Sequence, residues 1–205
     1  MVKRKQQKQA LASRKKPVAK NANSLRIIAG QWRGRRLNFI DSEGLRPTGD
    51  RVRETLFNWL QVDVPGAVCI DLFAGAGALG FEAASRGAAK VVMIEKSRAV
   101  AERLRQNVAL LDAGHVEIVN GSAIDWMNGS AEAADIVFVD PPFAGDLLEQ
   151  SLRQMEAACW LKDSTLIYIE TAKYQAFTVP AGWQQLKQKN TGQVSVYLYQ
   201  RSSER

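Results

Sequence analysis

The chain has 205 residues, of which 46% are hydrophobic, and a formal net charge of +7, so it can bury a full core as one main domain. No apolar run approaches the roughly 18–20 residues that a membrane span needs, and the first residues lack the apolar segment of a secretory signal. Cys69 and Cys159 are too few and too far apart for a disulfide framework or a zinc site. These features predict a cytoplasmic protein that uses neither a membrane nor a metal.

The charge is unevenly distributed along the chain. Residues 1–53 carry fifteen Lys/Arg against three acids, a net +12, whereas the remainder sums to −5. A basic arm joined to a slightly acidic domain is typical of a protein that binds a polyanion. Residues 1–24, rich in Lys and Gln with little to bury, predict an arm that is disordered in the free protein. Such arms often order on nucleic acid.

The next segment, residues 25–62, predicts a small extension. Residues 26–29 and 36–40 are expected to form the two strands of a hairpin. Asp50 is predicted to cap a helix that ends near residue 61. The helical spacing of its apolar residues predicts a buried stripe formed by Val52, Leu56 and Leu60.

From residue 63 onward, strand and helix patterns alternate. The expected strands are 68–71, 91–94, 116–119, 136–139 and 165–169, and the expected helices are 78–86, 98–111, 122–127 and 146–158. This alternation predicts an α/β domain with a parallel sheet and right-handed crossovers. The alternation ends near the C-terminus, where two strand patterns follow each other without a helix between them. They predict a terminal β-hairpin formed by residues 184–189 and 194–199 around Asn190-Thr191-Gly192.

A glycine-rich loop follows the first strand of this domain. Residues 75–80 satisfy G-x-G-x-x-G between a strand and a helix, and the next strand ends at Glu95, where a carboxylate can bind the two hydroxyls of an adenosine ribose. A nicotinamide dinucleotide and S-adenosylmethionine both fit this pattern. Asp71 stands just before the glycines, where it would repel a pyrophosphate and attract a sulfonium or ammonium group.

The apolar run 136–139 ends at Asp140-Pro141-Pro142-Phe143. A carboxylate accepts hydrogen bonds, the prolines hold rigid carbonyls, and the phenyl ring offers a flat face for stacking. Together they suit the capture of a planar group that bears an amine, such as a nucleobase. The structural alternative is a proline-stiffened loop in which Asp140 only forms the turn.

These motifs in this order resemble those of class I S-adenosylmethionine-dependent methyltransferases that modify amino groups. The segments RIIAGQWRGR (26–35), LRPT (45–48) and DRVRETLFN (50–58) resemble more closely the RsmD family, whose members methylate the exocyclic N2 of a guanine in bacterial 16S rRNA. The resemblance runs from about Leu25 to the C-terminus. It implies a Rossmann-like domain over residues 63–205, with a mostly parallel seven-stranded sheet whose last strand is inserted antiparallel, and 16S rRNA of the small ribosomal subunit as partner.

The resemblance also implies roles for individual residues. Asp140 and the carbonyl of Pro141 would accept the amine hydrogens, Pro142 would stiffen the loop, and Phe143 would stack on the base. Glu95 would bind the ribose and Asp71 the amino-acid end of the cofactor. The remaining residues expected to contact S-adenosylmethionine are Phe73, Gly75, Gly77, Ser122, Ala123, Arg46, Pro47 and Thr48.

The basic extension supplies the residues expected to contact RNA. The candidates for phosphate contacts are Arg26, Arg33, Arg35, Arg36, Arg51 and Arg53. Trp32 would either stack on an unpaired base or pack within the hairpin. Arg53 would otherwise form an ion pair with Glu54, worth under about 1 kcal/mol if exposed.

Four other functions remain open at this point. A DNA adenine-N6 methyltransferase uses the same Asp-Pro-Pro-aromatic motif, but the chain has no insertion large enough for a target-recognition domain. Methylation of a protein glutamine fits the basic arm less well. A non-catalytic RNA-binding assembly factor would keep the same fold, and a dehydrogenase would use only the glycine loop. A monomer is expected by default.

Overall fold

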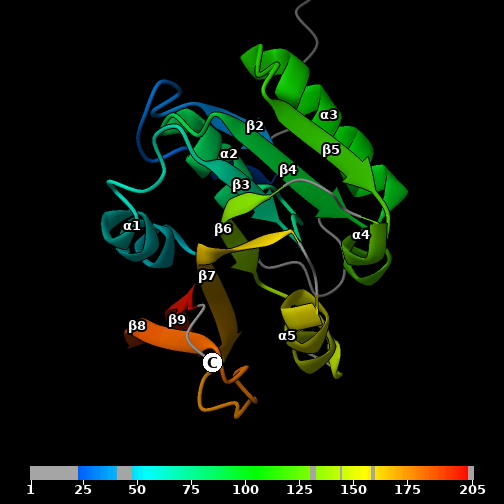
Figure 1. Cartoon of the computed structure of the whole chain (residues 1–205). Coiled ribbons are helices and arrows are strands. Elements are labelled where there is room, and N and C mark those ends of the chain that lie inside the picture. The colour runs from blue at the N-terminus through cyan, green and yellow to red at the C-terminus, as the bar shows by residue number, and fades with distance from the viewer. Residues whose placement is uncertain (1–22, 41–47, 130–132, 144, 158–159, 203–205) are drawn as a thin grey trace, which may run out of the picture.

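The structure is a computed structural model that describes residues 23–40, 48–129, 133–143, 145–157 and 160–202. The predicted arm therefore lies almost entirely outside the described residues, as do Arg46, Pro47 and Cys159. A two-stranded hairpin, β1 (Ser24–Arg26) with β2 (Arg36–Asn38), accompanies a seven-stranded sheet flanked by helices (Figure 1).

The remaining elements alternate as the sequence predicts. In chain order they are α1 (Asp50–Trp59), β3 (Val68–Asp71), α2 (Ala78–Ser85), β4 (Lys90–Glu95), α3 (Arg98–Leu111), β5 (Val116–Asn120), α4 (Ala123–Gly129), β6 (Ala134–Val139), α5 (Leu147–Ala157), β7 (Leu161–Ala172), β8 (Trp183–Thr191) and β9 (Val194–Arg201). No helix in the described ranges is both long and apolar enough to cross a membrane.

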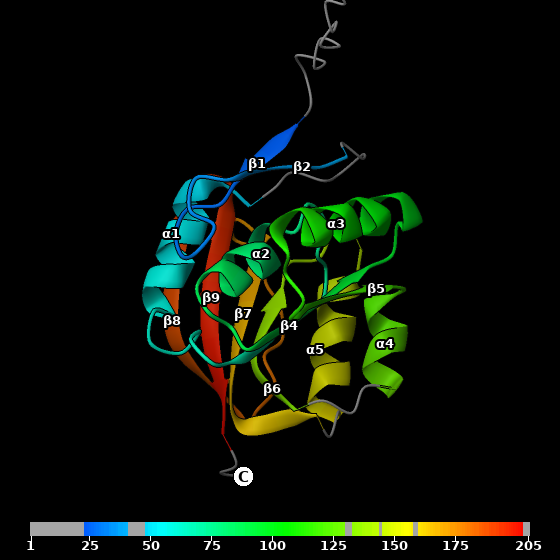
Figure 2. The same cartoon turned by 90° about the horizontal axis from the view of Figure 1, so that it is seen from above.

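The strands of the large sheet follow the order β5-β4-β3-β6-β7-β9-β8. Strands β3 to β7 pair in parallel, and β9 lies antiparallel between β7 and β8, which confirms the predicted mixed sheet. Figure 2 shows α1, α2 and α3 on one face and α4 and α5 on the other. The chain changes direction across the sheet between β3 and β6, the kind of switch point where doubly wound sheets bind ligands beyond the carboxyl ends of their strands.

Local details of the N-terminal extension and the tail differ from the prediction. Strand β1 lies two residues earlier than expected, and Gly49 rather than Asp50 is the N-cap of α1. Asp50 is already the first residue of the helix, and its carboxylate accepts hydrogen bonds from Arg26 and Arg53. In the tail, Gly192 alone supplies the positive φ, +60°, and a two-residue loop joins β8 to β9. A glycine in the first loop position with an ordinary second residue is the type II′ pattern.

The hairpin packs into the main core. Ile27, Trp32 and Leu37 are buried in the same apolar cluster as the inner faces of α1, α2 and α3. The loop between β1 and β2 approaches α2 so closely that a Cβ on Gly30, at φ +81°, would lie 1.8 Å from the carbonyl oxygen of Ser85. Only glycine fits there, and the contact fixes the hairpin against the C-terminal end of α2.

Candidate active site

Four carboxylates gather at the carboxyl ends of neighbouring parallel strands. Asp71 ends β3, Glu95 ends β4, Asp140 follows β6 and Glu170 lies near the end of β7. Because parallel strands all end at the same edge of a sheet, the sequence places these groups around the switch point.

The glycine loop and Glu95 are joined by hydrogen bonds. The backbone N–H of Gly75 donates to Oε2 of Glu95 at 3.0 Å, and that of Ser97 donates to Oε1 at 2.6 Å. Gly77 is left-handed at φ +80°, and a Cβ there would lie 2.6 Å from the ring of Phe81. Each oxygen of Glu95 keeps a free lone pair, so the carboxylate is oriented and can still accept a bond from a ribose hydroxyl.

Asp71 lies beneath this loop and is only 2% exposed. Its Oδ2 accepts the N–H of Gly80 at 3.1 Å, which ties β3 to the first turn of α2. Burial raises the pKa of Asp71 to about 7, hydrogen bonds from Gly80 and Phe73 oppose that rise, and Glu95 adds to it. A cation bound at this edge would favour its ionised form.

Asp140 receives a hydrogen bond from the N-terminal extension. The hydroxyl of Thr48 donates to its Oδ2 at 3.1 Å. Burial raises the pKa of Asp140 well above its ordinary value, Glu170 raises it further, and the bond from Thr48 opposes the rise. Thr48 is thus brought to the predicted catalytic loop from 92 residues away in sequence.

The rest of the Asp-Pro-Pro-Phe loop is arranged for contact with a ligand. Pro141 is buried, whereas Pro142 is exposed and the side chain of Phe143 is 48% exposed. Asp140 itself is half-buried, and an exposed ring beside this carboxylate can stack on a planar group that the carboxylate holds.

Sequence reasoning missed Glu170. It is 5% exposed, and the hydroxyl of Tyr168 donates to its Oε2 at 2.8 Å. Burial raises its pKa, and the bond from Tyr168 opposes this. The signal was present, because Glu170 follows the apolar run 167–169 just as Asp71, Glu95 and Asp140 follow theirs.

The predicted adenine-reading residues lie at the end of β5. Ala123 begins α4 and is buried, and Ser122 is half-buried beside it. The amide of Asn120 donates to the carbonyls of Glu95 and Lys96 at 2.9 and 3.1 Å, which joins the ends of β4 and β5. Phe73 packs against the apolar cluster under α4 and α5. Contact of these residues with the cofactor remains a prediction.

The RNA-contact candidates fall into two groups. Arg26, Arg33, Arg35, Arg36 and Arg51 are exposed, so contact with phosphates remains a prediction for them. Arg53 and Trp32 are buried, and the prediction that they contact RNA is wrong for this conformation. Arg53 is fully buried and pairs with Glu82 and Asp50 instead of Glu54. Trp32 is 8% exposed and stacks on His115 at 5.9 Å between ring centroids.

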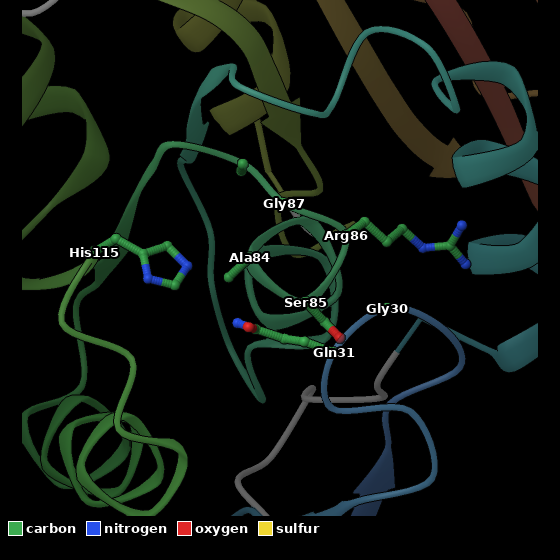
Figure 3. Close-up of a pocket in the computed structure, with 8 residues that line it drawn as sticks. Gly30, Gln31, Ala84, Ser85, Arg86, Gly87 and His115 are labelled. Carbon is green, nitrogen blue, oxygen red and sulfur yellow. The ribbon is translucent and has the colours of Figure 1, made fainter.

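An open pocket of about 390 Å³ lies beside that stack, lined by Gly30, Gln31, Ala84, Ser85, Arg86, Gly87, Ala88 and His115. It lies at the C-terminal end of α2, opposite the glycine loop, and Arg86 points away from His115 (Figure 3). This pocket is therefore separate from the carboxylate site. Among the described residues, no group of His, Cys, Asp or Glu is arranged to hold a metal ion.

Comparison with known proteins identifies the family. A family model described as "Conserved hypothetical protein 95" matches residues 25–200. Ribosomal RNA small subunit methyltransferase D of Escherichia coli K12 is 49% identical over 191 residues, which cover 93% of this chain and 96% of that protein. The protein of the same name from Haemophilus influenzae is 47% identical over 86% of this chain and 93% of its own length. The chain belongs to the ribosomal RNA small subunit methyltransferase D family.

Solved structures agree with this assignment. A putative methyltransferase from Escherichia coli, 48% identical, superposes with a TM-score of 0.81 over 89% of this chain and 100% of its own. An RNA methyltransferase from Salinibacter ruber in complex with S-adenosyl-L-homocysteine superposes with a TM-score of 0.61 over 78% of this chain and 96% of its own, at 21% identity. The second similarity is one of fold alone. The methyltransferase D family and the methyltransferase fold are thus established together.

Proposed function

We propose that this protein transfers a methyl group from S-adenosylmethionine to the exocyclic N2 amine of one guanine in 16S rRNA. Family membership makes it an S-adenosylmethionine-dependent methyltransferase of small-subunit rRNA. The acceptor atom, the roles of the residues, a cytoplasmic location and a monomeric state are our proposals.

The position of Asp140 carries the proposal. Within the described residues, its Oδ2 accepts only the Thr48 hydroxyl and its Oδ1 accepts no hydrogen bond. A guanine amine is a poor nucleophile because its lone pair is delocalised into the ring. If Asp140 and the carbonyl of Pro141 accept its two hydrogens, the lone pair becomes localised on nitrogen and the positive charge that develops there is stabilised.

The residues on the other side of the switch point fit S-adenosylmethionine. When bound, this cofactor supplies an electrophilic methyl group on a cationic sulfonium. Glu95 would accept the ribose hydroxyls through its free lone pairs, and Gly75 and Gly77 would let the cofactor approach the backbone. Asp71 would stabilise the positive charge from beneath the loop. Positioning the amine about 3 Å from the methyl carbon would then supply much of the acceleration.

Phe143 and the exposed arginines would bind the RNA. The target base must leave its stack to enter the site, which costs least in a loop, and Phe143 would stack on it there. Arg26, Arg33, Arg35, Arg36 and Arg51 would contact phosphates. Family membership favours this reading over a DNA adenine-N6 methyltransferase.

An Asp140→Ala variant separates catalysis from a scaffold role. Losing one such group should lower the rate of methyl transfer about 10²- to 10³-fold, with the Kd for S-adenosylmethionine within a few-fold of wild type. Asp63→Ala, at an exposed position in the turn after α1, is the matched control and should be unchanged in both readouts. Undiminished methylation by Asp140→Ala would contradict the catalytic role.

A further inference from the structure

Glu170 is a buried carboxylate next to the proposed reaction centre to which the mechanism above gives no role. The parallel register of β6 and β7 places Val139 opposite Ile169, so Asp140 and Glu170 are the next neighbours. Side chains at neighbouring positions of paired strands point to the same face of the sheet. The two carboxylates are also close enough to interact electrostatically. Burial is the largest cause of the raised pKa of Asp140, and the charge of Glu170 is the second.

One oxygen of Glu170 is fixed and the other is available. The Tyr168 hydroxyl donates a hydrogen bond to Oε2 at 2.8 Å, and the Tyr168 ring packs edge-on against the ring of Phe138, with 6.4 Å between the ring centroids. In the described part of the chain, Oε1 of Glu170 accepts no hydrogen bond. Among the described residues, only Nε of Arg53 is a fully buried side-chain polar atom without a hydrogen bond, so Oε1 of Glu170 keeps access to solvent and is open to a donor that arrives with the substrate.

We propose that Glu170 is a specificity residue that accepts the N1–H of the target guanine while Asp140 holds the adjacent N2 amine. This inference rests on the proposed function. On its Watson–Crick edge guanine presents two neighbouring donor groups, N1–H and N2–H₂, and the site presents two neighbouring acceptors from adjacent strands.

The same pair of carboxylates selects against adenine. Adenine also carries an amine on this edge, but its N1 is an acceptor, and a lone pair facing Oε1 of Glu170 is repelled. A site built to accept a donor rejects an analogue that lacks it, because the buried acceptor is left unpaired. Glu170 thus gives the site a preference for guanine that the Asp-Pro-Pro-Phe loop alone does not have.

The test replaces the target guanine with 2-aminopurine, which keeps the N2 amine and has an acceptor at N1. Substrates are 16S rRNA molecules carrying either base at that position, assembled into small subunits, and the readout is kcat/KM with the methylated nucleoside identified by mass. Wild type should prefer guanine, and Glu170→Gln, whose amide can donate to N1, should reduce that preference about 10- to 100-fold. The loss of O6 in 2-aminopurine affects both enzymes and cancels in the comparison.

Two further variants complete the test. Glu102→Gln, at an exposed position on α3, is the matched control and should keep the wild-type preference. Tyr168→Phe keeps the ring and removes the hydroxyl that holds Glu170, so its preference for guanine should fall between those of wild type and Glu170→Gln. If Glu170→Gln does not fold, Tyr168→Phe replaces it in the test. An unchanged preference in Glu170→Gln, or in Tyr168→Phe if that variant must serve, would overturn the inference, as would no preference in wild type. If wild type makes no N2-methylguanosine, the proposed function itself fails. The identity of the product nucleoside therefore distinguishes a failure of the proposed function from a failure of the role proposed for Glu170.

Discussion

Glu82 is the residue whose loss should damage the protein most outside the active site. Its carboxylate is fully buried and accepts four hydrogen bonds: from the backbone N–H groups of Ile28 and Ala29 at 2.9 and 3.0 Å, and from Arg53 and Arg86 at 3.3 and 2.8 Å. It therefore joins the hairpin, α1 and α2 at one point. The perturbation is Glu82→Gln, which keeps the volume and removes the charge.

The expected cost follows from what remains buried. Arg53 is fully buried and would keep only the partly exposed Asp50 as its charged partner, and removing one member of a buried ion pair costs about 3–5 kcal/mol. The amide nitrogen of Gln would also face backbone donors, and each buried donor left unpaired costs about 1–3 kcal/mol. Because these terms share atoms and do not add, we expect a loss of about 3–5 kcal/mol in the free energy of unfolding.

Urea denaturation followed by circular dichroism measures this loss. Glu117→Gln is the matched control, because Glu117 is exposed and lies 3.6 Å from Lys90; its effect should stay within about 1 kcal/mol. Arg53→Met combined with Glu82→Gln should cost less than the two single changes added together. A loss below about 1 kcal/mol for Glu82→Gln would refute the reasoning.

Three further predictions concern pH and salt. Because burial raises the pKa of Asp140 and the ionised group is the better acceptor, kcat/KM for methyl transfer should fall as pH drops through that pKa. Asp140→Asn should flatten this acid limb, and an unchanged limb would assign it to another group. The pKa of Asp71 is about 7 in the folded protein and about 3.9 in the unfolded chain. Between these pH values the folded state binds more protons than the unfolded state. Ligand-free wild type should therefore lose stability as pH rises from about 4 to 7. Urea midpoints should show less of this loss in Asp71→Asn; an equal loss would contradict the assignment. Deleting residues 1–24 should make the dependence of RNA affinity on salt shallower, and an unchanged slope in a binding titration would show that the arm does not contact RNA.

The sequence predicts the helices and strands of this protein well because they depend on local patterns of apolar and polar residues. Ser97 is the N-cap of α3 as predicted, with its hydroxyl accepting the N–H of Val100, and the buried stripe Val52, Leu56 and Leu60 lies on α1 and the turn after it. Strand ends are readable because an apolar run stops at a polar residue. Parallel pairing then brings Asp71, Glu95 and Asp140 to one edge.

Burial of individual charged and aromatic side chains is less predictable, because it depends on partners far away in sequence. Arg53 looks like one more arginine in a basic segment until Glu82, 29 residues later, meets it in the core. Trp32 is covered by His115, to which the sequence gives no role. The position of Glu170 at the end of an apolar run is readable from the sequence, whereas its proximity to Asp140 depends on the pairing of β6 with β7.

The measurement that tests the account most directly is methyl transfer from labelled S-adenosylmethionine to naked 16S rRNA, to small subunits lacking the modification, and to duplex DNA. The labelled nucleoside is then identified by mass. We predict N2-methylguanosine from at least one RNA substrate and no label in DNA. Label in N6-methyladenine, or no label in any substrate despite binding of the cofactor, would contradict the central claim.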